Sequence, residues 1–227
     1  MSKPFEVIVA DPPWSFKDTL TMSDVARGAA SNYHVMSNTD IAQLPIQDFI
    51  SPDGTILALW VPSSLLQEGL DTLNAWGFTH KQTYVWVKIR KIDSIKKEVF
   101  KSAKDLAEDL INKVPKAKAL ANFTLNIGSS LGFGMGRLFR QTHEICLIGI
   151  SSRGIYKQLN NKSQRSVSFG ENLRHSAKPE HLQDSLELMF PKARKLELFA
   201  RRHRPGWTCL GDEICNGEDI RVSLGKL

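Results

Sequence analysis

A carboxylate, two prolines and a tryptophan follow directly on an apolar run near the start of the chain. The run covers residues 5–10 and is rich in β-branched side chains, and Asp11, Pro12, Pro13 and Trp14 come next. Such a run predicts a short buried strand, and proline cannot continue a central strand. Asp11 is therefore expected at the carboxyl end of the strand, where open α/β sheets place their ligand crevices.

The chemistry available at this position is hydrogen-bond acceptance beside a flat ring. The carboxylate of Asp11 is one acceptor. The carbonyl of Pro12 is a second, because Pro13 has no N–H and disfavours helix. Trp14 offers a face on which a planar base could stack. The alternative interpretation is a plain turn in which Trp14 only packs, since Asp-Pro is good turn chemistry.

Strand and helix patterns alternate along the rest of the chain, which indicates an α/β fold with a mostly parallel sheet. The polar, basic residues 151–176 are expected to form a loop. Residues 94–114 have the period of an amphipathic helix, which could pack on the core, form a homodimer contact or follow a nucleic acid. Further strands are predicted at residues 55–61, 83–87, 144–149, 195–200 and 207–210, with helices within 38–49, 63–77 and 178–191.

Length and composition favour a single domain. The chain has 227 residues and is 41% hydrophobic, yet its apolar stretches end well short of the roughly 20 residues of a membrane span. The first residues lack the apolar segment of a signal peptide, so a cytoplasmic protein is expected. Three cysteines without C-x-x-C spacing and six scattered histidines predict no metal site.

Positive charge is concentrated in three segments. Residues 38–80 contain no Lys or Arg, whereas residues 88–118 contain ten of them against five acids. Residues 153–178 and 192–206 each contain six basic residues against one acid. Such segregation is typical of a protein that binds a polyanion such as nucleic acid, and the alternative is a solvated lysine-rich face.

Several short motifs, in order along nearly the whole chain, resemble the DPPW-type adenine N(6)-methyltransferases. This family includes the catalytic subunit of the eukaryotic messenger-RNA methyltransferase. The motifs are Asp11-Pro12-Pro13-Trp14, Gly28-Ala29-Ala30 with Tyr33 and Met36, Trp86-Val87-Lys88, His143-Glu144, His175-Ser176-x-Lys178-Pro179, Glu197-Leu198-Phe199-Ala200-Arg201, Gly206-Trp207 and Gly211-Asp212-Glu213.

The resemblance implies a fold and a cofactor. The fold is a Rossmann-like, S-adenosylmethionine-dependent methyltransferase domain in permuted (β-class) order, with helices on both faces of the sheet. The catalytic strand comes first and the cofactor strand lies near the C-terminus. One such domain would cover residues 1–227, with a basic helical insertion at about 90–128. A glycine-rich turn is missing after residues 195–200, and Asp212 stands where the family often has Asn.

The resemblance also implies roles for individual residues. Some have a purely structural alternative: Lys178 as a solvated helix start, Glu144 as a strand-start charge, and Tyr33 as loop packing. Asp212 and Glu213 could equally form a capping pair. The implied catalytic residues are Asp11, Pro12, Pro13 and Trp14; the substrate-binding residues are Trp14, Tyr33, Glu144, His175 and Lys178; the cofactor-binding residues are Asp11, Lys178, Pro179, Glu197, Phe199, Arg201, His203, Asp212 and Glu213.

Adenine is a poor nucleophile because the lone pair of its amine is delocalised into the ring. Two acceptors aimed at its two N–H groups favour tetrahedral geometry and gain strength as positive charge develops. The base must also be flipped from a duplex or come from a single strand. We expect DNA as substrate, with short or relaxed specificity, because a separate recognition domain would not fit beside the catalytic core. RNA methylation and a noncatalytic, nucleic-acid-binding partner subunit are the alternatives.

Overall fold

The computed structural model describes residues 4–16, 36–113, 115–116, 118, 130–132, 134, 138–171, 177–214 and 217–227. Within them, no helix is long and apolar enough to span a membrane. The elements, in chain order, are β1 (Val7–Ala10), α1 (Asn38–Ala42), η2 (Ile46–Phe49), β2 (Ile56–Val61), η3 (Ser63–Leu65), α2 (Leu66–Ala75), β3 (Thr79–Ile89), α3 (Ile92–Ile111), β4 (His143–Ile150), η4 (Arg153–Gln158), β5 (Val167–Glu171), α5 (His181–Met189), β6 (Lys195–Leu198), β7 (Trp207–Leu210) and α6 (Ile220–Gly225).

The chain divides into two compact units. The first contains Met1–Tyr84, Ile145–Ser166 and His181–Leu227, and the second contains Val85–Glu144 and Val167–Glu180. The expectation of one methyltransferase domain with a basic insertion stays a prediction.

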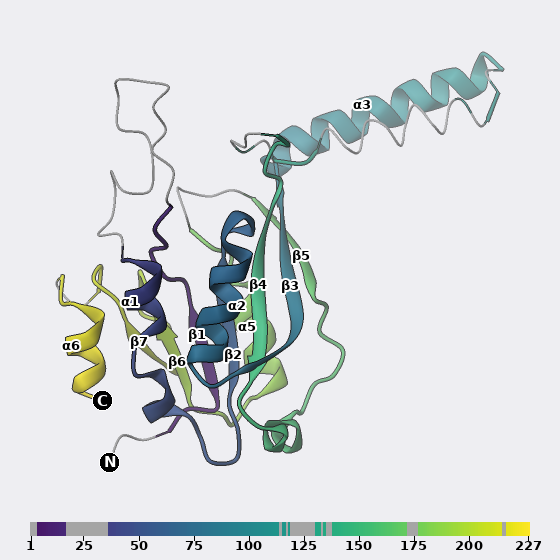
Figure 1. Cartoon of the computed structure of the whole chain (residues 1–227). Coiled ribbons are helices and arrows are strands. Elements are labelled where there is room, and N and C mark those ends of the chain that lie inside the picture. Colours follow the sequence, from purple (N-terminus) through teal and green to yellow (C-terminus); the bar gives the residue numbers. More distant parts are fainter. Residues whose placement is uncertain are drawn as a thin grey trace, which may run out of the picture. The chain divides into compact units, whose positions relative to one another are not determined.

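The described strands form one sheet in the order β5-β3-β4-β2-β1-β6-β7. Strand β1 is parallel to both of its neighbours, β2 and β6, and β7 is parallel to β6. Strand β4 runs antiparallel to β2. The mostly parallel α/β fold is confirmed, and so is the permuted order, because the first strand lies beside the C-terminal strands (Figure 1).

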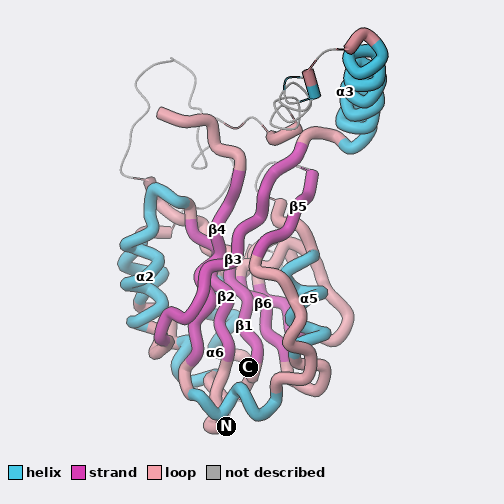
Figure 2. The backbone as a smooth tube through the Cα atoms, turned by 90° about the vertical axis from the view of Figure 1, so that its right-hand side faces the viewer, coloured by secondary structure: helices cyan, strands magenta, loops and turns pink. Residues whose placement is uncertain are grey.

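Apolar residues explain why β1 and β2 occupy the middle of the sheet. Every residue of both strands is buried, as expected for parallel strands covered on two faces. Figure 2 shows α2 and α5 on opposite sides of the sheet, which confirms helices on both faces. The core under α1 and α2 includes Ile8, Leu57, Leu59, Trp76 and Leu196.

Two parts of the structure differ from the sequence-based expectations. Residues 151–176 were expected to form a loop, but they contain the 3-10 helix η4 and the strand β5. Strand β5 pairs with β3 from Val85↔Val167 to Ile89↔Glu171. Helix α6 was not expected, although Asp219 caps it by accepting a hydrogen bond from the Arg221 N–H. The expected helix at 94–114 is confirmed as α3.

Candidate active site

The first unit places Asp11 to Ser15, here named the acceptor loop, directly after β1. The Trp14 N–H donates to the Pro12 carbonyl oxygen at 2.9 Å, and the Met36 N–H donates to the Pro13 carbonyl oxygen at 3.1 Å. A carbonyl oxygen has two lone pairs, so the Pro12 oxygen keeps one for a further donor. Backbone hydrogen bonds therefore hold the loop that carries the Asp11 carboxylate and the Pro12 carbonyl, and the role of these two groups as acceptors stays a prediction.

Trp14 does not have the environment expected of an open stacking surface. Its side chain is only 4% exposed and belongs to the hydrophobic core, and its indole N–H donates to the Trp60 carbonyl oxygen at 2.8 Å. Buried indoles usually find a partner for this N–H group. The expected stacking of a base on Trp14 does not match this packing, and the ring instead anchors the acceptor loop to β2.

The acceptor loop lies at the point where the chain order of the sheet reverses. From β1 the chain continues to β2 on one side, whereas β6 and β7 lie on the other side. Ala10 is in register with Leu198, so Asp11 and Phe199 leave the sheet side by side. In open α/β sheets, ligands bind outside the carboxyl ends of the strands at this switch point.

Glu197 adds a second carboxylate beneath the switch point. It is in register with Val9, and the Gln183 side-chain amide donates to its Oε1 at 3.1 Å. Burial raises the pKa of Glu197 above its ordinary value, and the negative charge of Asp11 adds to this rise. The hydrogen bond from Gln183 and the positive charges of Arg202 and Arg204 lower the pKa, but they do not cancel the effect of burial. Burial therefore favours the protonated form of Glu197 more than this form is favoured in an exposed glutamate.

The backbones after β6 and β7 approach each other closely. The Ala200 N–H donates to the Leu210 carbonyl oxygen at 2.8 Å, and a Cβ on Gly211 would lie 2.1 Å from the Ala200 carbonyl oxygen. A side chain at position 211 is therefore excluded. Phe199 has a φ of 60°, a left-handed conformation that is rare outside glycine and occurs preferentially at functional sites.

Charged side chains surround these two strand ends. Arg201 Nε lies 3.5 Å from Glu213 Oε1, and Asp212 Oδ1 accepts a hydrogen bond from the Glu213 N–H at 2.9 Å. Asp212, Glu213 and His203 are exposed. The carboxylates of Asp11, Asp212 and Glu213 suit a ligand with hydroxyl groups and positive charge, so the residues present fit S-adenosylmethionine with its ribose and sulfonium.

Arg204, which the sequence reasoning did not assign, fixes the segment between β6 and β7. Its guanidinium donates to Glu187 Oε1 at 2.7 Å and to Asp184 Oδ1 at 2.6 Å, both on α5. The Trp207 indole N–H donates to the same Glu187 oxygen at 2.7 Å. Charge-assisted bonds of this kind are among the stronger ones in proteins, so Arg204 ties this segment to α5.

The second unit brings Glu144 and Lys178 together, with Lys88 as a third member. Lys88 Nζ lies 2.6 Å from Glu144 Oε1, and Lys178 Nζ lies 3.1 Å from Glu144 Oε2. Burial by itself would raise the pKa of Glu144, but the charges and hydrogen bonds of the two lysines outweigh it and hold the pKa below its ordinary value. Lys88 also lies over the Trp86 ring, 5.2 Å from its centroid.

Pro179, another of the predicted site residues, is buried in the second unit and follows Lys178 directly in the chain. Its Cβ would lie 3.5 Å from a Cβ built on Gly170. Tyr33 and His175 lie outside the described residues. The sequence assigned no role to Lys88, although it belongs to the motif Trp86-Val87-Lys88. It follows the buried Trp86 by two residues on a strand, so both side chains lie on the same face of the sheet, and this spacing could have indicated a role for Lys88.

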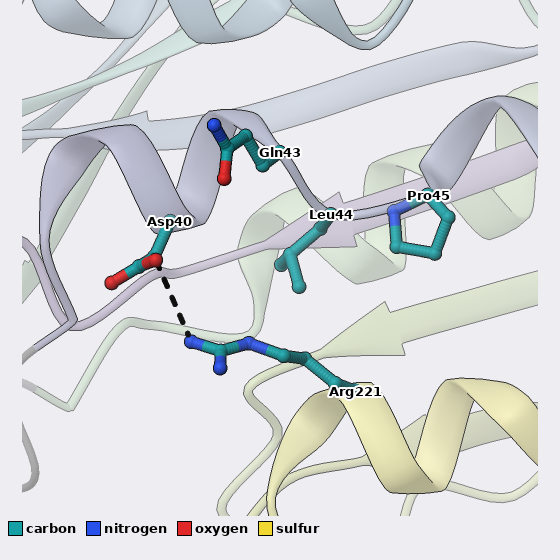
Figure 3. Close-up of a pocket in the computed structure, with 5 residues that line it drawn as sticks. All are labelled: Asp40, Gln43, Leu44, Pro45 and Arg221. Atoms are coloured by element: carbon teal, nitrogen blue, oxygen red, sulfur yellow. Dashed lines mark ion pairs between the residues drawn. The ribbon is translucent and has the colours of Figure 1, made fainter.

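A pocket in the first unit lies at α1 and α6, and none of the predicted site residues lines it (Figure 3). Arg221 on α6 lies 3.9 Å from the carboxylate of Asp40 on α1. This ion pair links the two helices across the pocket. The lining residues are Asp40, Gln43, Leu44, Pro45 and Arg221.

Comparison with known proteins gives consistent results. The family model MT-A70 matches residues 5–117 and 124–213. The chain is 26% identical over 212 residues to an N(6)-adenosine-methyltransferase MT-A70-like protein of Arabidopsis thaliana, an alignment that covers 92% of this chain and 24% of that protein. It is 25% identical over 212 residues to the human N(6)-adenosine-methyltransferase catalytic subunit METTL3, covering 92% of this chain and 28% of METTL3.

The alignment with a further relative covers most of that protein. The chain is 24% identical over 227 residues to the Type II methyltransferase M.MunI of Mycoplasma sp, and the alignment covers 93% of this chain and 78% of that protein. By contrast, the chain spans about a quarter of the length of the plant relatives that it matches. Because the family model matches most of its residues, the chain belongs to the MT-A70 family of S-adenosylmethionine-dependent methyltransferases.

Proposed function

We propose that the protein transfers the methyl group of S-adenosylmethionine to the exocyclic amine of adenine in a nucleic acid. The observation that carries this proposal is the position of Asp11 and the Pro12 carbonyl, which lie at the sheet's switch point beside the loop that begins at Phe199. Family membership and the printed names of the N(6)-adenosine-methyltransferase relatives support the same chemistry.

The acceptor loop would act on the amine through two hydrogen bonds. One N–H donates to the Asp11 carboxylate and the other to the free lone pair of the Pro12 carbonyl oxygen. Both bonds direct the nitrogen lone pair away from the ring and strengthen as the nitrogen becomes positive. When bound, S-adenosylmethionine would supply an electrophilic methyl carbon, so that the C–N bond would form as the C–S bond breaks and its electron pair stays on sulfur. The amine then loses one proton, for which Asp11 is the nearest base in the loop.

Residues after β6 and β7 would hold the cofactor. Asp212 and Glu213 are the proposed acceptors for the ribose hydroxyls, and Phe199 and Arg201 the proposed contacts of the adenosyl group. His203 is exposed and follows them. Lys178 is proposed for the methionine carboxylate or the substrate, and its pairing with Glu144 would set the direction of its ammonium group.

We propose DNA as the polymer, with short or relaxed sequence specificity. The similarity to the Type II methyltransferase M.MunI, along 93% of this chain, supports this proposal. Exposed basic residues within 153–178 and 192–206, among them Lys157, Arg165 and Lys192, would neutralise backbone phosphates. RNA is the competing substrate, since the acceptor loop would contact only the base.

One experiment tests the activity and the polymer together. The protein is incubated with radiolabelled S-adenosylmethionine and matched single-stranded DNA, duplex DNA or RNA, and the digested nucleosides are separated. We expect label on N6-methyldeoxyadenosine, with single-stranded DNA at least as good as duplex. Label on N6-methyladenosine alone would replace DNA by RNA. Label on cytosine or on no nucleoside would contradict the proposed activity and favour a noncatalytic binding role.

A further inference from the structure

The first residues of α1 hold the far end of the acceptor loop. The Ser15 N–H donates to Asn38 Oδ1 at 3.2 Å, and Asn38 is half-buried. Two positions earlier, the Met36 N–H donates to the Pro13 carbonyl oxygen, and Trp14 and Met36 form a parallel β-bridge. The segment from Met36 to Asn38 therefore runs alongside the loop and bonds to it at both Pro13 and Ser15.

The sequence of the loop makes the Ser15 bond unusually important. Pro12 and Pro13 have no N–H group, so the backbone donors from position 12 to 15 are those of Trp14 and Ser15. The Trp14 N–H is used within the loop, on the Pro12 carbonyl. The Ser15 N–H is then the backbone donor of this stretch that reaches another element, and the side chain of Asn38 receives it.

Helix α1 is itself firmly attached to the first unit. Its N-cap, Ser37, accepts a hydrogen bond from the Asp40 N–H at 3.0 Å. The Trp76 indole N–H, at the end of α2, donates to the Ile41 carbonyl oxygen at 3.0 Å in a buried bond. Ile41 is fully buried. Asn38 therefore presents its oxygen from a fixed helix end and not from a free loop.

We propose that Asn38 is a positioning residue for methyl transfer. It fixes the Ser15 end of the acceptor loop and so holds the Pro12 carbonyl and the Asp11 carboxylate at the spacing that the two N–H groups of the amine require. This inference rests on the proposed function. Displacement of a reacting group by about 1 Å can lower turnover roughly 100-fold, so a lost anchor at this position should affect catalysis more than binding.

Two variants separate the hydrogen bond from the side chain itself. Asn38→Ala removes the acceptor, whereas Asn38→Asp keeps an acceptor oxygen in the same place. We expect Asn38→Ala to lower kcat by about 10- to 100-fold, while the Kd for S-adenosylmethionine changes by less than about two-fold. Asn38→Asp should keep kcat close to the wild-type value. Thr39→Ala, an exposed neighbour on the same helix, is the matched control and should behave as wild type.

Amide hydrogen exchange at Ser15, measured by NMR on the same proteins, provides a readout that does not depend on turnover. Ser15 should exchange faster in Asn38→Ala and remain protected in Asn38→Asp. Wild-type kcat in Asn38→Ala, equal loss in both variants, or unchanged Ser15 exchange would each overturn the inference. If the wild-type protein methylates no nucleic acid, both the proposed function and the catalytic role of Asn38 are overturned. If the Ser15 amide in that case still exchanges faster in Asn38→Ala, the hydrogen bond between Ser15 and Asn38 is purely structural.

Discussion

The indole N–H of Trp14 donates to the backbone carbonyl oxygen of Trp60, 46 residues later in the chain, and this buried bond joins the acceptor loop to β2. Trp14 lies in the loop that follows β1, and Trp60 lies near the carboxyl end of β2, the strand that pairs in parallel with β1. The loop is thus attached to the sheet through its largest side chain.

Replacing this side chain should affect stability before it affects chemistry. Trp14→Phe keeps an aromatic ring but loses the N–H, and we expect it to lower the free energy of unfolding by about 1 kcal/mol. Trp14→Ala should cost about 3–5 kcal/mol because it also leaves a cavity. Urea denaturation measures both values. Phe16→Ala, at an exposed aromatic residue two positions later, should change stability little, and a similar cost for Phe16 and Trp14 would contradict the anchoring role.

Removing the Asp11 carboxylate should stop transfer without preventing cofactor binding. Asp11→Ala deletes one of the two acceptors for the amine, and we expect methyl incorporation to fall by at least about 1,000-fold, comparable to the loss of a preorganised charge-stabilising group. Calorimetry should still detect S-adenosylmethionine binding. Asp71→Ala, on the exposed side of α2, is the control. Near-normal turnover in Asp11→Ala would show that the acceptor has been wrongly assigned.

The ion pairs of Glu144 should make stability depend on pH. Its folded-state pKa is lowered, so its contribution is fully present above the unfolded-state pKa and is lost as pH falls through the folded-state pKa. We expect wild type to exceed Glu144→Gln in unfolding free energy by about 1–3 kcal/mol at pH 7, with the gap narrowing below about pH 4. Thermal unfolding across pH measures the gap, and a constant difference would argue against these ion pairs.

Arg204 should be hard to replace by lysine. Its guanidinium bonds to two carboxylates at once, which an ammonium group cannot reproduce with the same geometry. We expect Arg204→Lys to lower the free energy of unfolding by about 1–2 kcal/mol, and Arg204→Met by somewhat more. Arg165→Met, at an exposed arginine, is the comparison in chemical denaturation. If both arginine positions tolerate methionine equally, the attachment of the β6–β7 segment to α5 contributes little.

The central strands could be predicted from the sequence because β1 and β2 are short apolar runs with clear ends, and β6 alternates polar with buried apolar residues and continues into Phe199 and Ala200. Strand β5 could not, because it lies at the edge of the sheet, contains Gly170, and leaves Val167 and Phe169 45% and 61% exposed. Without a buried face there is no hydrophobic pattern to read. Helix α6 did carry a signal, in the cap Asp219 followed by the buried Ile220 and Leu224.

Within the candidate site, residue types were predictable and their partners were not. The Asp11 and Pro12 acceptors follow from the local sequence alone. The hydrogen bond of the Trp14 indole depends on Trp60, and the ion pair of Glu144 depends on Lys88, 56 positions away, so neither could be found from local spacing. The left-handed conformation of Phe199 was equally hidden, because sequence patterns assign such conformations to glycine.

The pairing of β1 with β6 has a consequence for the order of events during synthesis. The Arg194 N–H donates to the side chain of Glu6, 188 residues earlier, and the adjoining register places Ala10 against Leu198. Contacts between such distant residues close large loops and form slowly. The acceptor loop is synthesised well before β6, yet its strand gains its second neighbour only after residue 198 has emerged. Until then the nascent chain exposes an unpaired edge of β1, and a translational pause before residue 195 would extend the period in which a chaperone is most needed.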